Sequence, residues 1–215
     1  VVLDADGVRV GLPLNGSPST HILKPPIAGV DGSVFNEAFC MALAGAFKLD
    51  VARTHIQTIA DGEQQRHYLL VARYDRQTDH PGQRQHQEDF CQALGIVSEH
   101  KYQNEGGPGL AQAFALLRSA TRPSAPHTLK LLDYVVFNVL IGNHDAHGKN
   151  FSLLYTPAGA VLTPLYDALC TAVYPTLTDK MAMKIGSKYK FSEVMARHWE
   201  QFAIDAALSP AQVKK

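Results

Sequence analysis

The segment from Asn143 to Ser152 constrains this chain more than any other. It gathers an acid, two histidines, a lysine, two amides and a glycine into one short stretch. An apolar run from Leu131 to Ile141 precedes it, and a second apolar segment, Phe151 to Tyr155, follows it. Polar and titratable side chains held between two buried elements are typical of an active-site loop. The sequence therefore predicts a fold built around a functional loop at these residues.

A second acid, Asp167, ends the strand-like apolar run that starts at Leu162. Asp145, Asn150 and Asp167 together follow the layout of a phosphoryl-transfer centre. In such a centre the first Asp orients or deprotonates the attacking hydroxyl, while the Asn and the second Asp give hard oxygen ligands to Mg²⁺ on the ATP phosphates. This layout predicts Asp145 as the catalytic residue, with Asn150 and Asp167 as metal ligands.

Two more residues of the loop have predicted roles. Lys149 is expected to offset negative charge on the transferring phosphoryl group. His147 is expected to contact the nucleotide or to hold the loop, and a histidine hydrogen-bonded to backbone fits it equally well.

Two other functions compete with phosphoryl transfer. His144, Asp145 and His147 are credible ligands of zinc or manganese, and Asp167 could complete a two-metal hydrolase. Against this hydrolase, the ligands lie very close together in the chain and there is no second histidine pair. A nucleotide-binding module without turnover is the other alternative, and the residues leave it open.

Composition sets broader limits. The 215 residues suit one large domain or two small lobes around a cleft, and the formal net charge is zero, so direct nucleic-acid binding is not indicated. The three cysteines lie far apart and are expected to be reduced, mostly buried thiols. Without a signal peptide or a membrane-length apolar run, we expect a cytoplasmic protein with no membrane contact. The chain opens on Val1 without an initiator Met, so we expect a piece of a longer protein.

Strand patterns dominate before about residue 75. Ser33 is the expected N-cap of a helix whose apolar stripe is Phe35, Phe39, Leu43 and Phe47. The expected elements are a hairpin around Asp6-Gly7 in residues 1–12, strands at 20–23, 51–60 and 66–74, and the helix at 33–47.

Helix patterns dominate after residue 75. Thr128 is the expected cap of a central helix, and Ser192 that of the last helix. The expected elements are helices at 88–94, 110–119 and 129–141, a hairpin of 151–155 with 160–165, a strand at 181–185 and a basic turn at 186–190. The hairpin would bring Asn150 near Asp167. The whole pattern predicts an α+β fold with a small β-rich lobe (1–75) and a larger helical lobe (76–215).

The loop, together with Tyr166-Asp167, resembles the catalytic and metal-binding segments of the HipA-type serine/threonine kinases, toxins of bacterial toxin–antitoxin pairs. The resemblance implies a two-lobed protein-kinase-like fold that uses ATP and Mg²⁺. Further matching segments follow in the family's order: residues 19–24, Asn36-Glu37, residues 73–76, residues 87–89, Lys101-Tyr102 and residues 106–109.

The resemblance also assigns nucleotide contacts in the first lobe. Lys24, at the end of a predicted strand, would grip the ATP phosphates, and Glu37 would either pair with Lys24 or favour the helix dipole. The main chain of Ala72, Arg73 and Tyr74 would bond the adenine edge. Asp75 would lie near the ribose, unless this stretch is only a surface Arg-Asp-Arg cluster.

Partners are likewise implied by the resemblance alone. It implies a protein substrate, an aminoacyl-tRNA synthetase in the best-known members, and a HipB-like DNA-binding antitoxin. Family members also carry an N-terminal subdomain and a serine-bearing, glycine-rich loop before the region that matches Val1, and they run on past the point that matches Lys215. We therefore expect that this fragment alone could bind ATP weakly and lack catalysis.

Overall fold

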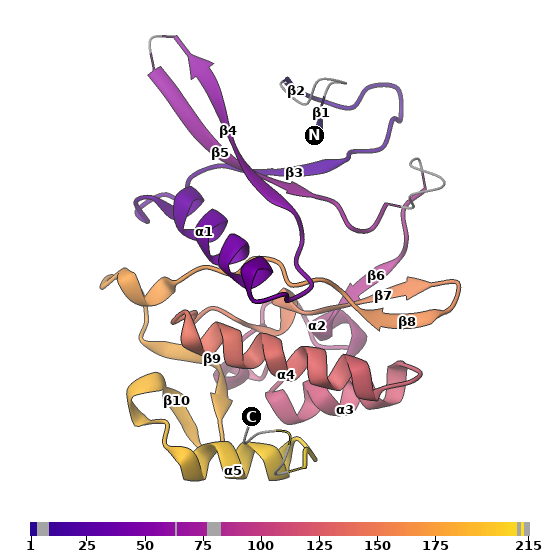
Figure 1. Cartoon of the computed structure of the whole chain (residues 1–215), viewed down its shortest axis with the longest axis vertical. Helices are drawn as coiled ribbons and strands as arrows, with labels where there is room; N and C mark the ends of the chain where they lie inside the picture. Colours follow the sequence, from indigo (N-terminus) through magenta and orange to yellow (C-terminus); the bar gives the residue numbers. More distant parts are fainter. Residues whose placement is uncertain (4–8, 63, 77–82, 210–211, 213–215) are drawn as a thin grey trace. The chain divides into compact units, whose positions relative to one another are not determined.

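The computed structural model describes residues 1–3, 9–62, 64–76, 83–209 and 212 (Figure 1). The chain forms two compact units. The first comprises Val1–His86 and Pro164–Leu169, and the second comprises Gln87–Thr163 and Cys170–Lys215. Where a single boundary at residue 75 was expected, the first unit thus runs on to His86 and also takes a short segment from much later in the chain.

The first unit contains a three-stranded antiparallel sheet. Its strand order is β3 (His21–Lys24), β5 (Gln64–Ala72), β4 (Thr54–Asp61), so the longest strand lies in the middle. Leu69, Leu70 and Val71 in β5 are buried, as expected for a central strand rich in apolar residues. β1 (Val2–Leu3) pairs antiparallel with β2 (Val10–Gly11), and the predicted Asp6-Gly7 turn between them lies outside the described residues.

The helix α1 (Ser33–Ala46) buries a different face from the predicted one. Phe39 and Phe47 are each 67% exposed and Phe35 is 49% exposed. The buried face, which packs against β4 and β5 (Figure 1), carries smaller or polar side chains: Ser33, Val34, Glu37, Cys40, Met41 and Ala44. The prediction that the phenylalanines form the buried face is therefore wrong, because α1 is oriented with Glu37 toward the interior.

The start of α1 was also predicted incorrectly. Gly32, with a left-handed φ of 71°, is the N-cap, and Ser33 is the first helical residue. The Ser33 hydroxyl instead accepts a hydrogen bond from the Ile27 amide at 2.9 Å, which closes the loop before the helix.

Residues 164–169 are attached to the first unit by backbone hydrogen bonds. The Leu165 amide donates to the Asp50 carbonyl, and the Ala52 amide donates to the Leu165 carbonyl, both at 2.8 Å. Val51 and Leu165 thus form an isolated parallel bridge, and the strand expected from Val51 begins only at Thr54. This bridge positions the segment that carries Asp167.

The second unit contains a second three-stranded antiparallel sheet, in the order β6 (Gln87–Asp89), β7 (Ser152–Thr156), β8 (Gly159–Leu162). The predicted hairpin is confirmed as β7 and β8. The predicted helix at 88–94 is partly wrong, because Glu88 and Asp89 belong to β6 and the short helix α2 covers only Phe90–Ala93. The reason is that the Asp89 carboxylate accepts from the Gln92 amide and caps α2.

Two adjacent helices, α3 (Leu110–Ala120) and α4 (Ala125–Leu140), supply much of the core of this unit (Figure 1). The cap predicted for α4 is wrong. The helix begins a turn earlier, after Ser124, with Pro126 in its first turn, where a missing amide hydrogen costs nothing. Thr128 lies inside the helix and donates its hydroxyl to the Ala125 carbonyl.

The C-terminal part of the unit pairs β9 (Lys180–Ile185) with β10 (Lys188–Lys190) and ends in α5 (Ala196–Asp205). Lys188 to Lys190 therefore form a strand, where a turn was predicted. Ser192 does not cap α5, because Met195 is the N-cap and its amide donates to His198 Nδ1. Short 3₁₀ turns complete the structure: η1 (Gln103–Glu105), η2 (Gly148–Asn150), η3 (Thr171–Val173) and η4 (Phe191–Glu193).

Helices and antiparallel sheets occur in both units, which confirms the α+β class. Cys40, Cys91 and Cys170 are free thiols, as predicted, and the first two are buried. In the part of the chain that the structure describes, every helix is too short or too polar to cross a bilayer.

Candidate active site

In the first unit, Lys24 at the end of β3 lies between two carboxylates. Its ammonium is 2.7 Å from a Glu37 oxygen and 2.5 Å from Asp167 Oδ1. The Glu37 side chain is 6% exposed and that of Asp167 is 41% exposed. Of the two roles left open for Glu37, the structure thus shows the ion pair with Lys24.

The contacts in this cluster shift the pKa values of Lys24 and Glu37. Burial alone lowers the pKa of Lys24, but Asp167 and Glu37 outweigh it and raise that pKa, so the ammonium stays protonated. Burial raises the pKa of Glu37, although Lys24 partly opposes the shift. When all three are ionised, two carboxylates face one ammonium, and Asp167 is the more exposed of the two.

The backbone at Asp167 is held in an uncommon conformation. Its φ is 59°, in the left-handed region that few residues other than Gly adopt, although Asp tolerates it better than most. Such conformations persist where the surrounding structure imposes them, and they cluster at functional sites. Next to it, the Tyr166 ring lies 6.0 Å from the Tyr74 ring. A carboxylate oxygen held in this way and open to solvent fits Mg²⁺, which prefers hard oxygen ligands.

In the second unit, a chain of amide side chains anchors the loop that follows α4. Asn138 Nδ2 donates to the Tyr134 carbonyl, and Asn143 Nδ2 donates to Asn138 Oδ1 at 2.7 Å. Asn143 Oδ1 then accepts from the Asp145 amide at 3.0 Å. Asn138 and Asn143 are buried, so these bonds fix the backbone of Asp145 relative to α4.

The Asp145 carboxylate has a partner that was not predicted. Tyr102 donates its hydroxyl to Asp145 Oδ1 at 2.6 Å. Burial, the hydrogen bond and the Asp145 charge all raise the pKa of Tyr102 well above its ordinary value. In the sequence, Lys101-Tyr102 is one of the segments that match the family, and no sequence motif connects Tyr102 with Asp145.

His147 and Asn150 close the same loop on itself. The His147 amide donates to Asn150 Oδ1 at 3.0 Å, and the Asn150 amide donates to the His147 carbonyl at 2.9 Å. His147 is buried, and its ring lies edge-on to Tyr102 with 5.3 Å between centroids. These contacts support the loop-holding role for His147. The Asn150 amide oxygen has two lone pairs, so its bond to His147 is compatible with a metal.

Lys149 forms an ion pair within the same unit. Its ammonium donates to Asp89 Oδ2 at 2.7 Å, while Asp89 Oδ1 caps α2. The Asp89 side chain is 12% exposed and that of Lys149 is 32% exposed. One carboxylate thus connects the loop that carries Lys149 with the start of α2.

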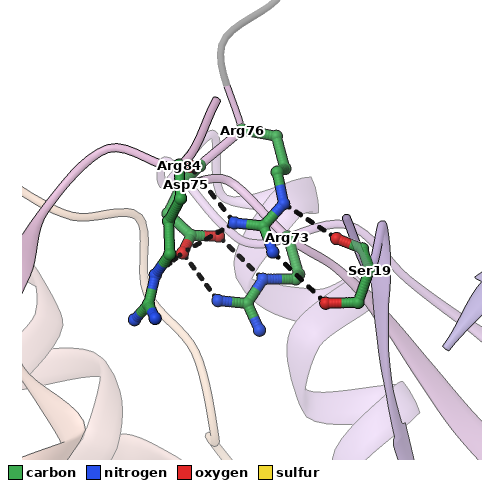
Figure 2. A network of polar contacts seen from close by, with 5 residues as sticks. All are labelled: Ser19, Arg73, Asp75, Arg76 and Arg84. Carbon is green, nitrogen blue, oxygen red and sulfur yellow. Dashed lines mark hydrogen bonds and ion pairs between the residues drawn. The ribbon is translucent and has the colours of Figure 1, made fainter. Parts of the chain in front are cut away.

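At the end of β5, Asp75 is the centre of an arginine cluster (Figure 2). Arg73 donates to both Asp75 oxygens, at 2.9 and 2.6 Å. Arg76 and Arg84 each approach Asp75 Oδ2, at 3.1 and 3.0 Å. Arg76 also donates to the carbonyl and hydroxyl of Ser19. With a side chain that is 4% exposed, Asp75 belongs to a buried cluster, so the alternative of a surface Arg-Asp-Arg cluster is wrong.

Asp75 keeps its charge in this setting. Burial tends to raise its pKa, but the hydrogen bond and charge of Arg73, with the charges of Arg76 and Arg84, lower it below its usual value. Just before it, the Ala72 and Arg73 amides donate to the Arg53 and Thr20 carbonyls. An adenine contact along this stretch would therefore draw on other backbone groups.

The proposed zinc or manganese ligands do not form a cluster. Among the described residues, no three His, Cys, Asp or Glu side chains are grouped as metal ligands. His144 Nδ1 lies 3.2 Å from the Thr171 hydroxyl, and its ring stacks on Phe191 at 4.6 Å. Burial lowers the pKa of His144. This environment is that of a packed core histidine.

Asn150 and Asp145 lie in the second unit and Asp167 in the first. The shared magnesium site of Asn150 and Asp167 therefore stays a prediction. The same is true of the nucleotide contacts predicted for residues 72–75 and for His147.

Comparison with known proteins points to one family. The model of the family described as "HipA-like C-terminal domain" matches residues 3–215. A Sinorhizobium fredii protein named "Putative kinase Y4mE" is 48% identical over 217 residues, covering 100% of this chain and 50% of that protein. The Shewanella oneidensis "Serine/threonine-protein kinase toxin HipA" is 33% identical over 193 residues, covering 83% of this chain and 43% of that protein.

Solved structures agree with the sequence relatives. HipA in a Shewanella oneidensis complex of HipA, HipB and operator DNA has a TM-score of 0.79 and 30% identity, over 91% of this chain and 47% of that one. The Helicobacter pylori proinflammatory kinase CtkA has a TM-score of 0.59 over 90% of this chain and 76% of that one, and at 12% identity it supports the fold alone. The chain spans about half the length of the curated relatives it matches.

Proposed function

The chain belongs to the HipA-like C-terminal domain family, and we propose that it is the nucleotide-binding and catalytic part of a serine/threonine protein kinase. The reaction would transfer the γ-phosphoryl group of ATP to a hydroxyl of a protein substrate. The observation that carries the proposal is the contact of Lys24 with both Glu37 and Asp167. It joins a phosphate-binding cation to a carboxylate suited to magnesium.

Each residue has a role set by its chemistry. Lys24, held by Glu37, would bind the phosphates of ATP, and Asp167 and Asn150 would hold Mg²⁺. When bound, Mg²⁺ would supply positive charge to the phosphate oxygens. Asp145 would accept the hydrogen bond of the substrate hydroxyl and direct it at the phosphoryl group, while Lys149 would offset charge at that group.

Nucleotide recognition would use the end of β5. The main chain of Ala72, Arg73 and Tyr74 would meet the adenine edge, and His147 would contact the nucleotide from the catalytic loop. Asp75 was expected near the ribose, and its engagement with Arg73, Arg76 and Arg84 supports an indirect part, in which it shapes the end of the strand.

The relatives support one of the two partners that we propose. Because a structural relative is HipA in a complex with HipB and operator DNA, a HipB-like DNA-binding antitoxin is the partner that we propose for this chain. The substrate would be a protein such as an aminoacyl-tRNA synthetase, modified in the cytoplasm. The net charge of zero gives this chain no general attraction to DNA, so contact with an operator would come through the antitoxin.

Calorimetric titration of ATP with and without Mg²⁺ tests the proposal. We expect magnesium-dependent binding that weakens by at least about tenfold in Asp167→Ala. Asp179→Ala is the matched control, because Asp179 pairs with Lys190 on the surface of the second unit, and it should leave binding unchanged. Phosphotransfer to a protein substrate should then be lost in Asp145→Asn.

Three outcomes would contradict the proposed kinase function. Binding that ignores Mg²⁺ and Asp167→Ala would remove the metal assignment. Nucleotide binding with no rate that depends on Asp145 would favour a binding module. Absence of ATP binding both in this chain and in a version extended at its N-terminus to the length of the relatives would refute the proposed function.

A further inference from the structure

The hydroxyl of Tyr102 lies against the carboxylate that the proposed reaction uses. We propose that Tyr102 is a positioning residue, which holds Asp145 Oδ1 so that the other carboxylate oxygen, Oδ2, faces the substrate hydroxyl. This inference rests on the proposed kinase function and deepens it. Tyr102 and Asp145 are 43 positions apart in the chain, and both belong to the second unit.

The direction of the hydrogen bond is fixed by chemistry. An ionised carboxylate can only accept, so Tyr102 donates, and the 2.6 Å separation is that of a charge-assisted O–H···O⁻ bond. Within the described ranges, no other side chain donates to the Asp145 carboxylate. Tyr102 is therefore the group that selects the rotation of this carboxylate.

Tyr102 is itself held from several sides. The Glu105 and Gly107 amides donate to its carbonyl, at 3.0 and 2.9 Å. Its ring lies edge-on to His147, and Lys101 Nζ is 5.0 Å from the ring centroid. Because its backbone is hydrogen-bonded and its ring is packed, Tyr102 can impose the position of its hydroxyl on Asp145.

The segment around Tyr102 is also closed against the catalytic loop. The Gly148 amide donates to the Lys101 carbonyl at 3.3 Å. A Cβ on Gly148 would come within 2.4 Å of Pro108 Cγ, and a Cβ on Gly107 would come within 2.7 Å of the Tyr102 carbonyl oxygen. Glycine at 148 therefore lets the loop approach Pro108, and glycine at 107 lets the backbone after Tyr102 fold back on itself.

Two constraints then act on Asp145 together. Its amide is bonded to Asn143, which is anchored in α4, and its Oδ1 is bonded to Tyr102. With both the backbone and one oxygen fixed, the second oxygen has a defined direction. The main work of Asp145 would be to orient a hydroxyl for in-line attack, so a fixed direction of this oxygen contributes directly to the rate.

An inhibitory role predicts a different result, in which the tyrosine hydroxyl occupies the carboxylate oxygen that the substrate needs as an acceptor. Tyr102 would then block the site, and its removal would raise the rate. The two ideas predict opposite signs for one substitution.

Phosphotransfer kinetics of wild type, Tyr102→Phe, Asp145→Asn and the double variant decide between them. We expect kcat of Tyr102→Phe to fall about tenfold with KM for ATP unchanged, since the ring stays and only the hydroxyl is lost. Adding Tyr102→Phe to Asp145→Asn should change nothing further. The control is Tyr155→Phe, which removes a tyrosine–carboxylate bond to Glu88 in the same unit and should leave kcat unaltered.

A second measurement does not need activity. In ¹³C-tyrosine NMR spectra, the Tyr102 signal is the one lost in Tyr102→Phe. It should stay unionised at a pH where an ordinary tyrosine, with a pKa of about 10, is ionised. Asp145→Asn should bring the pKa of Tyr102 down, because the neighbouring negative charge is gone.

The outcomes separate the two claims. Absence of phosphate transfer, both in this chain and in the version extended at its N-terminus, overturns the proposed function and, with it, the role of Tyr102. An active wild type with an equally active or faster Tyr102→Phe overturns the positioning role alone. A Tyr102 signal that titrates normally and ignores Asp145→Asn would also overturn it, because the contact would then not exist.

Discussion

Replacing Asp75 with Asn removes the negative charge at the centre of the cluster of Arg73, Arg76 and Arg84 shown in Figure 2. The amide has nearly the same shape, so packing is retained and the change is electrostatic. Arg73 and Arg76 are mostly buried, with side chains 18% and 13% exposed, and would lose the carboxylate that balances their charge. We predict a large loss of stability in the first unit.

The size follows from the geometry. Removing one member of a buried ion pair costs about 3–5 kcal/mol, because the remaining charge stays desolvated. Arg84 is 60% exposed and contributes little, and the side-chain carbonyl that Asp75→Asn retains still accepts part of the hydrogen bonding. We therefore expect a loss of about 2–4 kcal/mol in the free energy of unfolding. For a urea slope of about 2 kcal/mol/M, the midpoint would fall by about 1–2 M.

Urea titrations followed by two probes would measure this loss. Circular dichroism reports both units, whereas the fluorescence of Trp199, the single tryptophan, reports the second unit. Hydrogen exchange at the β5 amides would locate the effect in the first unit. The control Glu193→Gln makes the same exchange in an exposed pair with Lys188 and should shift stability by less than about 0.5 kcal/mol. Equal midpoints for Asp75→Asn and this control would refute the reasoning.

The pH dependence of the same cluster has a definite sign. The folded-state pKa of Asp75 lies below its ordinary value of 3.8. Its contribution to the free energy of unfolding is therefore present above pH 3.8 and is lost as the pH falls through the folded-state pKa. In urea titrations at acid pH, the difference in stability between wild type and Asp75→Asn should disappear. Gly148→Ala should cost about 1–3 kcal/mol of stability, because its Cβ would overlap the Pro108 ring. Gly45 lies inside α1, and a Cβ there would be 3.6 Å from its nearest neighbour, Val51 Cγ2. Gly45→Ala should therefore stabilise the fold by about 0.5–1 kcal/mol. Thermal melts of Gly148→Ala and Gly45→Ala would measure the two effects.

Residue types and their order along the chain were enough to predict the α+β class and to select Lys24, Asp145 and Asp167 as candidate site residues, whose roles stay predictions. Lys24 at a strand end, a polar loop between apolar elements and an acid after a hairpin are local patterns, and local patterns can be read from sequence. The bond from Tyr102 to Asp145 could not be predicted, because it joins segments that only the tertiary fold brings together.

The errors at helices have a common cause. In α1 the large apolar side chains Phe35, Phe39 and Phe47 face outward, because the face with Glu37 packs inward and pairs with Lys24. In α4, a threonine with good capping chemistry was preferred to the preceding Ser124-Ala125-Pro126, whose proline fits a first helical turn. Burial and capping depend on what surrounds an element, and sequence patterns do not contain that context.

The contact between Lys24 and Asp167 spans 143 positions of the chain. During synthesis, the sheet of β3, β5 and β4 and the helix α1 therefore leave the ribosome well before Asp167 is added to the chain. Closing so long a loop also carries a large entropic cost, which delays this contact relative to local structure. Assembly of the lysine cluster is thus a late event in biogenesis, and a chain that ends before Asp167 lacks the second carboxylate that Lys24 contacts.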